Sequence, residues 1–164
     1  MASSVIALEA LHDVSAFDCG IPALTNWLQT TARQHQKKLI SRTFVLVDDA
    51  QPSRILGYYA LAIRAMTPSG DLPAVMAKRL PREVPGMTLA RLAVGLMEQG
   101  KGHGELLLVD AMQRVRAVTA EVGGYALFVD AKDAGGAMFY RKYGFTPFES
   151  DPLILFMPIA SMPV

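Results

Sequence analysis

The chain has 164 residues, which is within the range of one domain and long enough to bury a core, and 51% of them are hydrophobic. No charge-free run reaches the roughly 18 apolar residues of a membrane-spanning helix, and the N-terminal segment lacks the basic region of a signal peptide. The net charge of +1 does not by itself indicate a nucleic-acid ligand. We expect one cytoplasmic domain over residues 1–164, without a membrane partner.

The hydrophobic spacing predicts strands and helices in a mixed order. The predicted elements, in chain order, are strand Val5–Leu11, helix Pro22–Lys38, strands Thr43–Val47 and Arg54–Ile63, a short helix around Ala74–Leu80 within the proline-rich segment Ser69–Pro85, strand Leu89–Val94, helix Gly104–Ala120, strand Tyr125–Val129, helix Ala134–Tyr143 and strand Pro152–Met157. No repeat or linker interrupts this order. It predicts a mixed α/β sheet in a single domain.

The most informative segment is rich in glycine and joins a predicted strand to a predicted helix. Gln99–Gly104, with glycine at alternate positions, follows the apolar run Leu89–Val94, and a helix-forming run begins at Glu105. Glycine lacks the Cβ that would keep an anion from the backbone, and a helix start carries about half a positive charge. Lys101 can add charge near the anion. The segment therefore predicts a phosphate or pyrophosphate site, and hence a nucleotide-derived ligand.

The spacing of these glycines excludes two common phosphate loops. The segment is neither G-x-x-x-x-G-K-[ST] of nucleoside-triphosphate binding nor G-x-G-x-x-G early in a Rossmann unit. A Rossmann oxidoreductase would also need a ribose-binding acid, and Glu121, at about the right distance, falls at a predicted helix end. From the residues alone, a glycine-rich turn without a ligand remains the alternative.

Cysteine and histidine form no catalytic or metal-binding pattern. Cys19 is the one cysteine, so no internal disulfide can form, and no histidine lies near it in the sequence. We expect a buried structural thiol. His12, His35 and His103 have no paired-ligand spacing, so we expect no metal.

Two blocks of the sequence resemble the GNAT N-acetyltransferases. The pattern Gln99-x-x-Gly102-x-Gly104 is similar to the acyl-CoA pyrophosphate loop of that family, and a second block runs from Phe128 to Phe145. Their order and separation both match. The resemblance implies a mixed α/β GNAT fold, with a central, mostly antiparallel, splayed β-sheet flanked by helices. It also implies acetyl-CoA as the acetyl donor and CoA as the product.

Three further segments resemble the GNAT-type toxins of bacterial type II toxin–antitoxin modules: Phe17–Leu28, Gly57–Leu61 and Ala90–Val94. Two positions depart from the usual pattern of that group, Ala90 in place of Gly and Gly95 in place of Asp. The resemblance implies acetylation of the α-amine of aminoacyl-tRNA, which blocks translation, and neutralisation by a ribbon-helix-helix antitoxin. The high apolar fraction fits burial against a partner, so we expect a homodimer, an antitoxin complex or both.

Acetyl transfer from a thioester needs a stabilised oxyanion and a proton for the departing thiolate. A tyrosine suits the second task, because its pKa of ~10 lies near that of an alkyl thiol. Tyr140 occupies the family position of this acid. Tyr143, three residues on, is the competing candidate, and both could instead be core aromatics.

Backbone N–H groups near the end of the central strand could hold the thioester carbonyl, if the strand is splayed from its neighbour. The resemblance adds the glycine loop and the aromatic residue before the acid. The residues expected to bind acetyl-CoA are Leu92, Ala93, Val94, Gln99, Gly100, Lys101, Gly102, His103, Gly104 and Phe139.

A general base is not marked by any pattern. Glu83, Glu98 and Glu105 are available. A lysine amine, with a pKa of ~10.4, would need strong help at neutral pH, whereas an α-amine near ~7.7–8.0 is already partly neutral. The absence of a marked base therefore favours an α-amine, although a water chain could also serve a lysine.

Positive charge is concentrated in one part of the sequence. Residues 19–97 hold ten Lys and Arg against four Asp and Glu, and the remainder holds six against eleven. If the fold brings the basic clusters to one face, they form a groove for phosphates; a solvated helix face and a charged loop are the alternative. The candidate tRNA contacts are Arg33, Lys37, Lys38, Arg42, Lys78, Arg79, Arg82 and Arg91.

Two rival functions remain. A GNAT enzyme that acetylates a small-molecule amine or a protein amine predicts no saturable tRNA binding. A non-catalytic CoA-binding module predicts ligand binding without turnover, and no effect of Tyr140→Phe. The glycine loop together with Phe139 and Tyr140 argues against the second rival.

Overall fold

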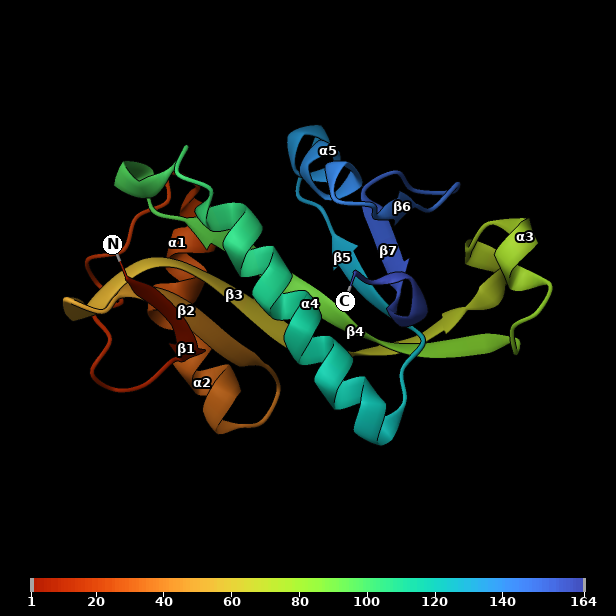
Figure 1. The fold of residues 1–164 in the computed structure, drawn as a ribbon, viewed down its shortest axis with the longest axis horizontal. Coiled ribbons are helices and arrows are strands. Elements are labelled where there is room, and N and C mark those ends of the chain that lie inside the picture. Colours follow the sequence, from red (N-terminus) through yellow and green to blue (C-terminus); the bar gives the residue numbers. More distant parts are fainter. Residues whose placement is uncertain (1, 164) are drawn as a thin grey trace. The chain divides into compact units, whose positions relative to one another are not determined.

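The computed structural model describes residues 2–163 (Figure 1). Among them, seven strands form a mostly antiparallel sheet in the order β1-β2-β3-β4-β5-β7-β6. The strands are β1 (Ser3–Ala7), β2 (Arg42–Asp48), β3 (Gln51–Pro68), β4 (Glu83–Val94), β5 (Ala126–Asp130), β6 (Thr146–Pro147) and β7 (Ile154–Pro158). The α-helices are α1 (Pro22–Thr30), α2 (Ala32–Lys37), α3 (Ala74–Ala77), α4 (His103–Val122) and α5 (Ala134–Lys142). The predicted mixed α/β class is confirmed.

Contacts within the chain define two compact units, which are described in turn. The first consists of Met1–Ala62 and Ala90–Ala111, and the second of Ile63–Leu89 and Met112–Val164. β3, β4 and α4 each contribute residues to both units. Every helix within residues 2–163 is too short or too polar to span a bilayer.

The first unit contains the antiparallel strands β1, β2 and β3, which lie side by side in Figure 1. Their register pairs Val5 with Leu46 and Val45 with Tyr58. β2 is rich in β-branched and aromatic residues, which favour strands. α2 packs on β2, and α1 contacts α2. Trp27 of α1 stacks on Tyr58 with ring centroids 6.1 Å apart, which joins the helix layer to the sheet.

The predicted helix Pro22–Lys38 is divided into α1 and α2. α1 begins with Pro22, whose fixed φ suits the first turn of a helix. Thr31 leaves the helical conformation, with φ −124° and ψ −34°. Beside it, the Thr30 hydroxyl donates to the Asn26 carbonyl at 2.7 Å, a local bond that bends helices. Hydrophobic periodicity carries no signal for this break.

The first strand is also shorter than predicted at its C-terminal end. β1 ends at Ala7, whereas the predicted strand Val5–Leu11 continued for four more residues. The chain turns instead, because the backbone N–H of Glu9 donates to Nδ1 of His12 at 2.9 Å. Residues Glu9–His12 therefore form a turn and do not continue the strand.

The buried His12 predicts that folding stability depends on pH. Its Nε2 has no hydrogen-bond partner among the described residues. Burial lowers the pKa of His12 below its ordinary value of 6.5, and Arg33 adds to this effect while Glu9 opposes it. The unfolded chain therefore binds this proton more readily, so the free energy of unfolding falls as pH drops below about 6.5.

The His12→Asn variant separates this effect from general acid denaturation, because its side-chain oxygen can accept the same N–H without titrating. Midpoints of thermal unfolding should be measured between pH 8 and pH 5. The wild type is expected to lose more stability over this interval than the variant. Parallel curves would show that His12 does not carry the effect.

β3 and β4 are longer than the predicted strands Arg54–Ile63 and Leu89–Val94. The prolines between them suggested an irregular segment. Instead, the residues just beyond the two strands are joined by a hydrogen bond from the Ser69 N–H to the Arg82 carbonyl at 2.9 Å. The connection between them contains the short α3, as predicted.

α4 begins at His103, one residue before the predicted helix Gly104–Ala120 and two before the helix-forming run. The Gly102 carbonyl accepts the N–H of Leu106 at 3.2 Å, so this residue of the glycine loop already takes part in the first helical turn. The two-residue strand β6 was not predicted, since it is too short to show periodicity.

The second unit combines parallel and antiparallel pairing. β4 and β5 are parallel over Gly86–Leu89 and Ala126–Val129, whereas β5 with β7 and β7 with β6 are antiparallel. α5 packs on β6 and β7 (Figure 1). Phe128, Phe148 and Phe156 form an aromatic core with ring centroids 5.9 to 6.2 Å apart. This core fixes the strands from which α5 extends.

Candidate active site

The glycine-rich segment forms an open loop before α4. Gly100 and Gly102 have φ of +79° and +83°, the left-handed region that other residues rarely adopt. Apart from the glycines themselves and their chain neighbours, no atom of residues 2–163 lies within 4 Å of the place where a Cβ would stand at either residue. The loop leads directly into a 20-residue helix, with Gly104 in its first turn. Open backbone at a helix start is the arrangement expected for a phosphate.

The side chain of Gln99 holds this loop on the end of β4. Its Nε2 donates to the Val94 carbonyl at 3.1 Å and to the Cys19 carbonyl at 3.2 Å. Cys19 itself is buried, as predicted. The structure therefore brings together two predicted parts of the site, the strand end and the loop. Gln99 connects them through its two hydrogen bonds to backbone carbonyls.

Glu98 is a buried carboxylate beside the loop, and the sequence did not mark it. It accepts hydrogen bonds from Lys101 Nζ at 3.3 Å and from Arg54 Nη2 at 3.4 Å. Burial would raise the pKa of Glu98, but the hydrogen bonds and charges of Lys101 and Arg54 hold it below its ordinary value. A carboxylate with a lowered pKa is a weak base, so Glu98 is poorly suited to deprotonate an amine.

The side chains of two residues expected to contact the cofactor, Lys101 and His103, lie next to Glu98. Lys101 is paired with it, which reduces the positive charge that Lys101 could offer an anion. The ring of His103 is buried, and its Nε2 lies 3.5 Å from Glu98 Oε1 without a hydrogen bond. The backbone N–H groups of these residues, and not their side chains, are the groups suited to a ligand.

The final residues of β4, Leu92–Val94, lie beyond the pairing of β4 with β5, which covers Gly86–Leu89. On the opposite edge, β3 approaches closely: a Cβ at Gly57 would stand 2.9 Å from the Ala93 carbonyl oxygen. Glycine is required there for the two backbones to pack. Pairing with β5 over part of its length is the feature expected of a splayed strand.

α5 carries the expected acid and belongs to the second unit. Its N-terminus is capped by Asp133, which accepts the Gly136 N–H at 2.9 Å. Tyr140 is half-buried against Phe139 and Phe145, with ring centroids 5.2 and 5.7 Å away. Burial raises the pKa of the Tyr140 phenol. The hydroxyl therefore stays protonated at neutral pH, which is the state that a general acid requires.

The competing candidate, Tyr143, differs from Tyr140 in position. It lies at the C-cap of α5, with φ −96° and ψ 12°, and not on the face of a continuing helix. Its ring contacts Phe139 at 5.1 Å, and Lys142 Nζ lies 5.5 Å from the ring centre. The argument from helical spacing therefore does not apply to Tyr143.

The eight basic residues expected to contact tRNA are divided between the units. The first unit contains Arg33, Lys37, Lys38, Arg42 and Arg91, and the second contains Lys78, Arg79 and Arg82. All are exposed except Arg91, which is half-buried. Two already have internal partners: Arg33 donates to the Glu9 and His12 carbonyls at 2.9 and 2.7 Å, and Arg91 lies 4.5 Å over the Trp27 ring. The remaining six are better placed for phosphates.

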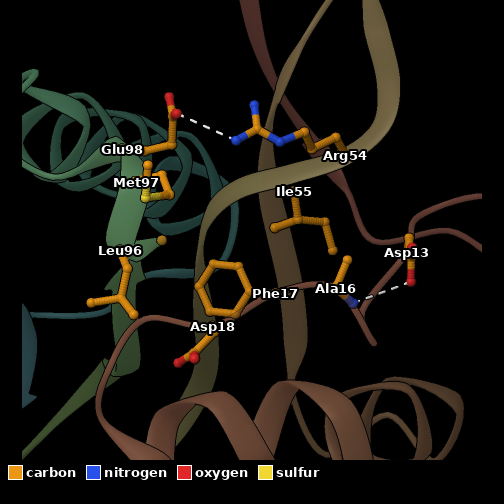
Figure 2. A pocket seen from close by; sticks show the side chains of 10 residues that line it. Asp13, Ala16, Phe17, Asp18, Arg54, Ile55, Leu96, Met97 and Glu98 are labelled. Atoms are coloured by element: carbon orange, nitrogen blue, oxygen red, sulfur yellow. Dashed lines mark hydrogen bonds and ion pairs between the residues drawn. The ribbon is translucent and has the colours of Figure 1, made fainter.

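A pocket of about 360 Å³ lies next to the loop in the first unit (Figure 2). Its lining residues are Asp13, Ala16, Phe17, Asp18, Arg54, Ile55, Gly95, Leu96, Met97 and Glu98. Figure 2 shows Arg54 directed toward Glu98, so the one cation of the lining is already paired. Three carboxylates against one guanidinium disfavour a phosphate. The pyrophosphate of a cofactor is therefore better placed at the glycine loop.

No group of three or more His, Cys, Asp or Glu side chains within residues 2–163 could hold a metal ion.

Comparisons with known proteins relate the chain to a tRNA-acetylating toxin. No protein-family model matches it. It is 34% identical over 145 residues to the tRNA-acetylating toxin of Mycobacterium tuberculosis (strain ATCC 25618 / H37Rv), a match that covers 88% of this chain and 85% of that protein.

Two solved structures are similar over nearly their whole length. AtaT complexed with acetyl-methionyl-tRNAfMet has a TM-score of 0.90 and 31% identity, covering 98% of this chain and 96% of AtaT. A mutant AtaT toxin bound to the C-terminus of the antitoxin AtaR and acetyl-CoA has a TM-score of 0.83 and 30% identity, covering 97% and 94%.

The fold and the site thus define an acetyl-CoA-dependent N-acetyltransferase of the GNAT class. More narrowly, the chain belongs to the family of tRNA-acetylating GNAT toxins. The resemblance stated from the sequence, and acetyl-CoA as the donor, are confirmed.

Proposed function

We propose that this chain is the toxin of a type II toxin–antitoxin system, which transfers acetyl from acetyl-CoA to the α-amine of aminoacyl-tRNA and so blocks translation. The observation that carries the proposal is the similarity of nearly the whole chain to a tRNA-acetylating toxin. The similarity to AtaT in complex with an acetylated methionyl-tRNA supports the same substrate. The open glycine loop supports the donor, because its backbone suits a pyrophosphate.

Acetyl-CoA would be held mainly by backbone groups. The N–H groups of Gly100–Gly104 would bind the pyrophosphate, aided by the dipole of α4. The backbone at Leu92–Val94 would bind the pantetheine arm and polarise the thioester carbonyl. Gln99 would keep these two parts together through its bond to the Val94 carbonyl. Phe139 would support Tyr140, since their rings are in contact.

The transfer itself needs one acid. The amine nitrogen attacks the thioester carbon, and a tetrahedral oxyanion forms. As that intermediate collapses, the C–S bond breaks and Tyr140 donates its proton to the thiolate. The nitrogen loses one proton to a water relay. No strong base is needed for this, because an α-amine with a pKa near ~7.7–8.0 is partly neutral at pH 7. Another proton from water restores the Tyr140 hydroxyl.

The proposal extends to the assembly and location of the protein. AtaT binds the C-terminus of the antitoxin AtaR, and we propose that a ribbon-helix-helix antitoxin neutralises this chain too. Exposed apolar side chains in each unit, such as Leu39 at 90% and Ile63 at 86% exposure, support burial against an antitoxin, in a homodimer or both. A chain that acetylates aminoacyl-tRNA acts in the cytoplasm. We also propose that residues 1–164 form one GNAT domain.

The direct test is translation by purified components, since a crude extract contains its own acetyl-CoA. The protein is expected to stop synthesis when acetyl-CoA is supplied, and to have no effect with CoA alone. Continued synthesis in the presence of acetyl-CoA would contradict the proposal. Acetylation of small-molecule or protein amines in the same mixture would then favour the rival function.

The basic residues yield a separate prediction about tRNA binding. Reversing Lys37, Lys38, Arg79 and Arg82 to Glu should weaken binding about 100-fold at low salt. If each cation neutralises one phosphate, the slope of log affinity against log salt should become shallower by about 3, because each contact contributes about 0.7 to 0.9. Titration of labelled tRNA at several salt concentrations measures both quantities.

The control reverses two exposed cations outside the basic region, Arg116 and Lys132. Their reversal should change the affinity only slightly. If the fourfold variant keeps the affinity and the salt slope of the wild type, the groove for tRNA lies elsewhere on the protein.

A further inference from the structure

Arg64 of β3 connects two strands of the second unit through its side chain. Its Nη1 donates to Thr88 Oγ1 at 2.8 Å and to Asp130 Oδ2 at 3.1 Å, and its Nη2 donates to Asp130 Oδ1 at 3.4 Å. Thr88 belongs to β4 and Asp130 to β5. The guanidinium carbon lies 4.9 Å over the ring centre of Phe128. The Arg64 side chain is 19% exposed and is therefore partly shielded from water.

These contacts fall at the end of the β4–β5 pairing. The last residues in register are Leu89 and Val129, and the preceding pair is Thr88 with Phe128. Asp130 is the final residue of β5. Arg64 thus fastens the two strands at the point where their pairing stops. A planar guanidinium suits this position, because it reaches both carboxylate oxygens and an adjacent hydroxyl in one geometry.

Asp130 is also the residue from which the chain leads to α5. Only three residues separate it from the helix, and two of them are fixed. The Ala131 N–H donates to the Leu153 carbonyl at 2.7 Å, and Asp133 caps the helix. A displacement of Asp130 would therefore be passed on to α5, which contains Tyr140.

We infer that Arg64 is a positioning residue for acetyl transfer. By fixing Thr88 to Asp130, it determines where α5 holds Tyr140 relative to the paired end of β4. This inference rests on the proposed role of Tyr140 as the acid. Asp130 neutralises the charge of Arg64, so the side chain serves geometry and not the binding of phosphates.

The test compares Arg64→Met with the wild type in the acetylation of aminoacyl-tRNA. Methionine keeps an apolar stem over Phe128 but removes every hydrogen bond of the guanidinium. We expect kcat to fall about 10- to 100-fold, since a misplacement of 1 Å can cost about 100-fold. The KM for acetyl-CoA should stay within about twofold, because Arg64 contacts Thr88 and Asp130 and not the glycine loop.

Four further variants make the result specific. Arg64→Lys keeps a cation that can reach Asp130, and should recover kcat to within about fivefold of the wild type. Asp130→Asn should lower kcat, and the double variant with Arg64→Met should be no worse than the poorer single variant. Arg116→Met is the control, since Arg116 is exposed and donates to the Pro163 carbonyl at 3.1 Å. It should leave kcat unchanged.

The possible outcomes separate this inference from the function on which it depends. A lowered melting temperature with wild-type kcat in Arg64→Met would overturn the inference and leave a purely structural contact. A raised KM for aminoacyl-tRNA with unchanged kcat would overturn it in favour of an RNA contact. If Arg64→Met does not fold, wild-type kcat in Asp130→Asn overturns it. Activity of Tyr140→Phe in the same assay would refute the acid itself, and the inference with it.

Discussion

The Tyr140→Phe variant is expected to lose acetyl transfer by about 100- to 10,000-fold, while its affinity for acetyl-CoA stays within a few fold of the wild type. A positioned general acid contributes an acceleration of that size. The substitution removes one hydroxyl and keeps the ring, so the contacts with Phe139 and Phe145 persist. Expression of the variant should no longer arrest growth. Single-turnover rates and acetyl-CoA titration measure the two parts of the expectation.

The Tyr143→Phe variant is the matched control for this experiment. It removes the same hydroxyl from the residue at the C-cap of α5, and should keep activity near that of the wild type. Because burial raises the pKa of Tyr140, the wild-type rate should not decline through loss of its proton near neutral pH. Growth arrest by Tyr140→Phe would contradict the assignment, and loss of activity in Tyr143→Phe alone would transfer it to the other tyrosine.

The Gly102→Glu variant is expected to weaken acetyl-CoA binding by at least about 100-fold. Gly102 has φ of +83°, which strains any residue with a side chain. The space beside it is open, so the new carboxylate would occupy the proposed seat of the pyrophosphate and repel it. Both effects act on the cofactor, and titration with acetyl-CoA measures their sum.

Two variants separate these effects from a general disturbance of the fold. Gly102→Ala adds the backbone strain without the charge, and should give an intermediate affinity. Gly70→Glu introduces the same carboxylate at a glycine that also has open space but lies in the 3-10 helix Ser69–Asp71. Its affinity for acetyl-CoA should remain that of the wild type. An unchanged titration curve for Gly102→Glu would exclude the glycine loop as the cofactor site.

The parts of the site that the sequence predicted are those encoded locally. The glycine loop is a run of six neighbouring residues, and its left-handed φ values follow from Gly100 and Gly102 themselves. The short helix that contains Tyr140 was predicted over Ala134–Tyr143 and lies at Ala134–Lys142. Such features depend on residues within a few positions of one another, so a single sequence can reveal them.

The features that were missed depend on residues far apart in the chain. The hydrogen-bonded pair Glu98 and Arg54 is separated by 44 positions, and the pair Arg64 and Asp130 by 66. Nothing near Glu98 in the sequence indicates that its carboxylate is buried and would engage Lys101. Likewise, the predicted strand Arg54–Ile63 ended too early, whereas β3 continues to Pro68 as the hydrogen-bonded neighbour of β4 in the sheet. Tertiary contacts determine these features.

The central claim is tested most directly by following the acetyl group. The wild type and Tyr140→Phe should be incubated with radiolabelled acetyl-CoA and a pool of charged tRNA, beside a pool that has been deacylated. The account predicts label in the charged tRNA fraction with the wild type, released on deacylation as N-acetyl amino acid, and very little with the variant or with deacylated tRNA. Absence of label from charged tRNA, while the wild type still binds acetyl-CoA, would contradict the account.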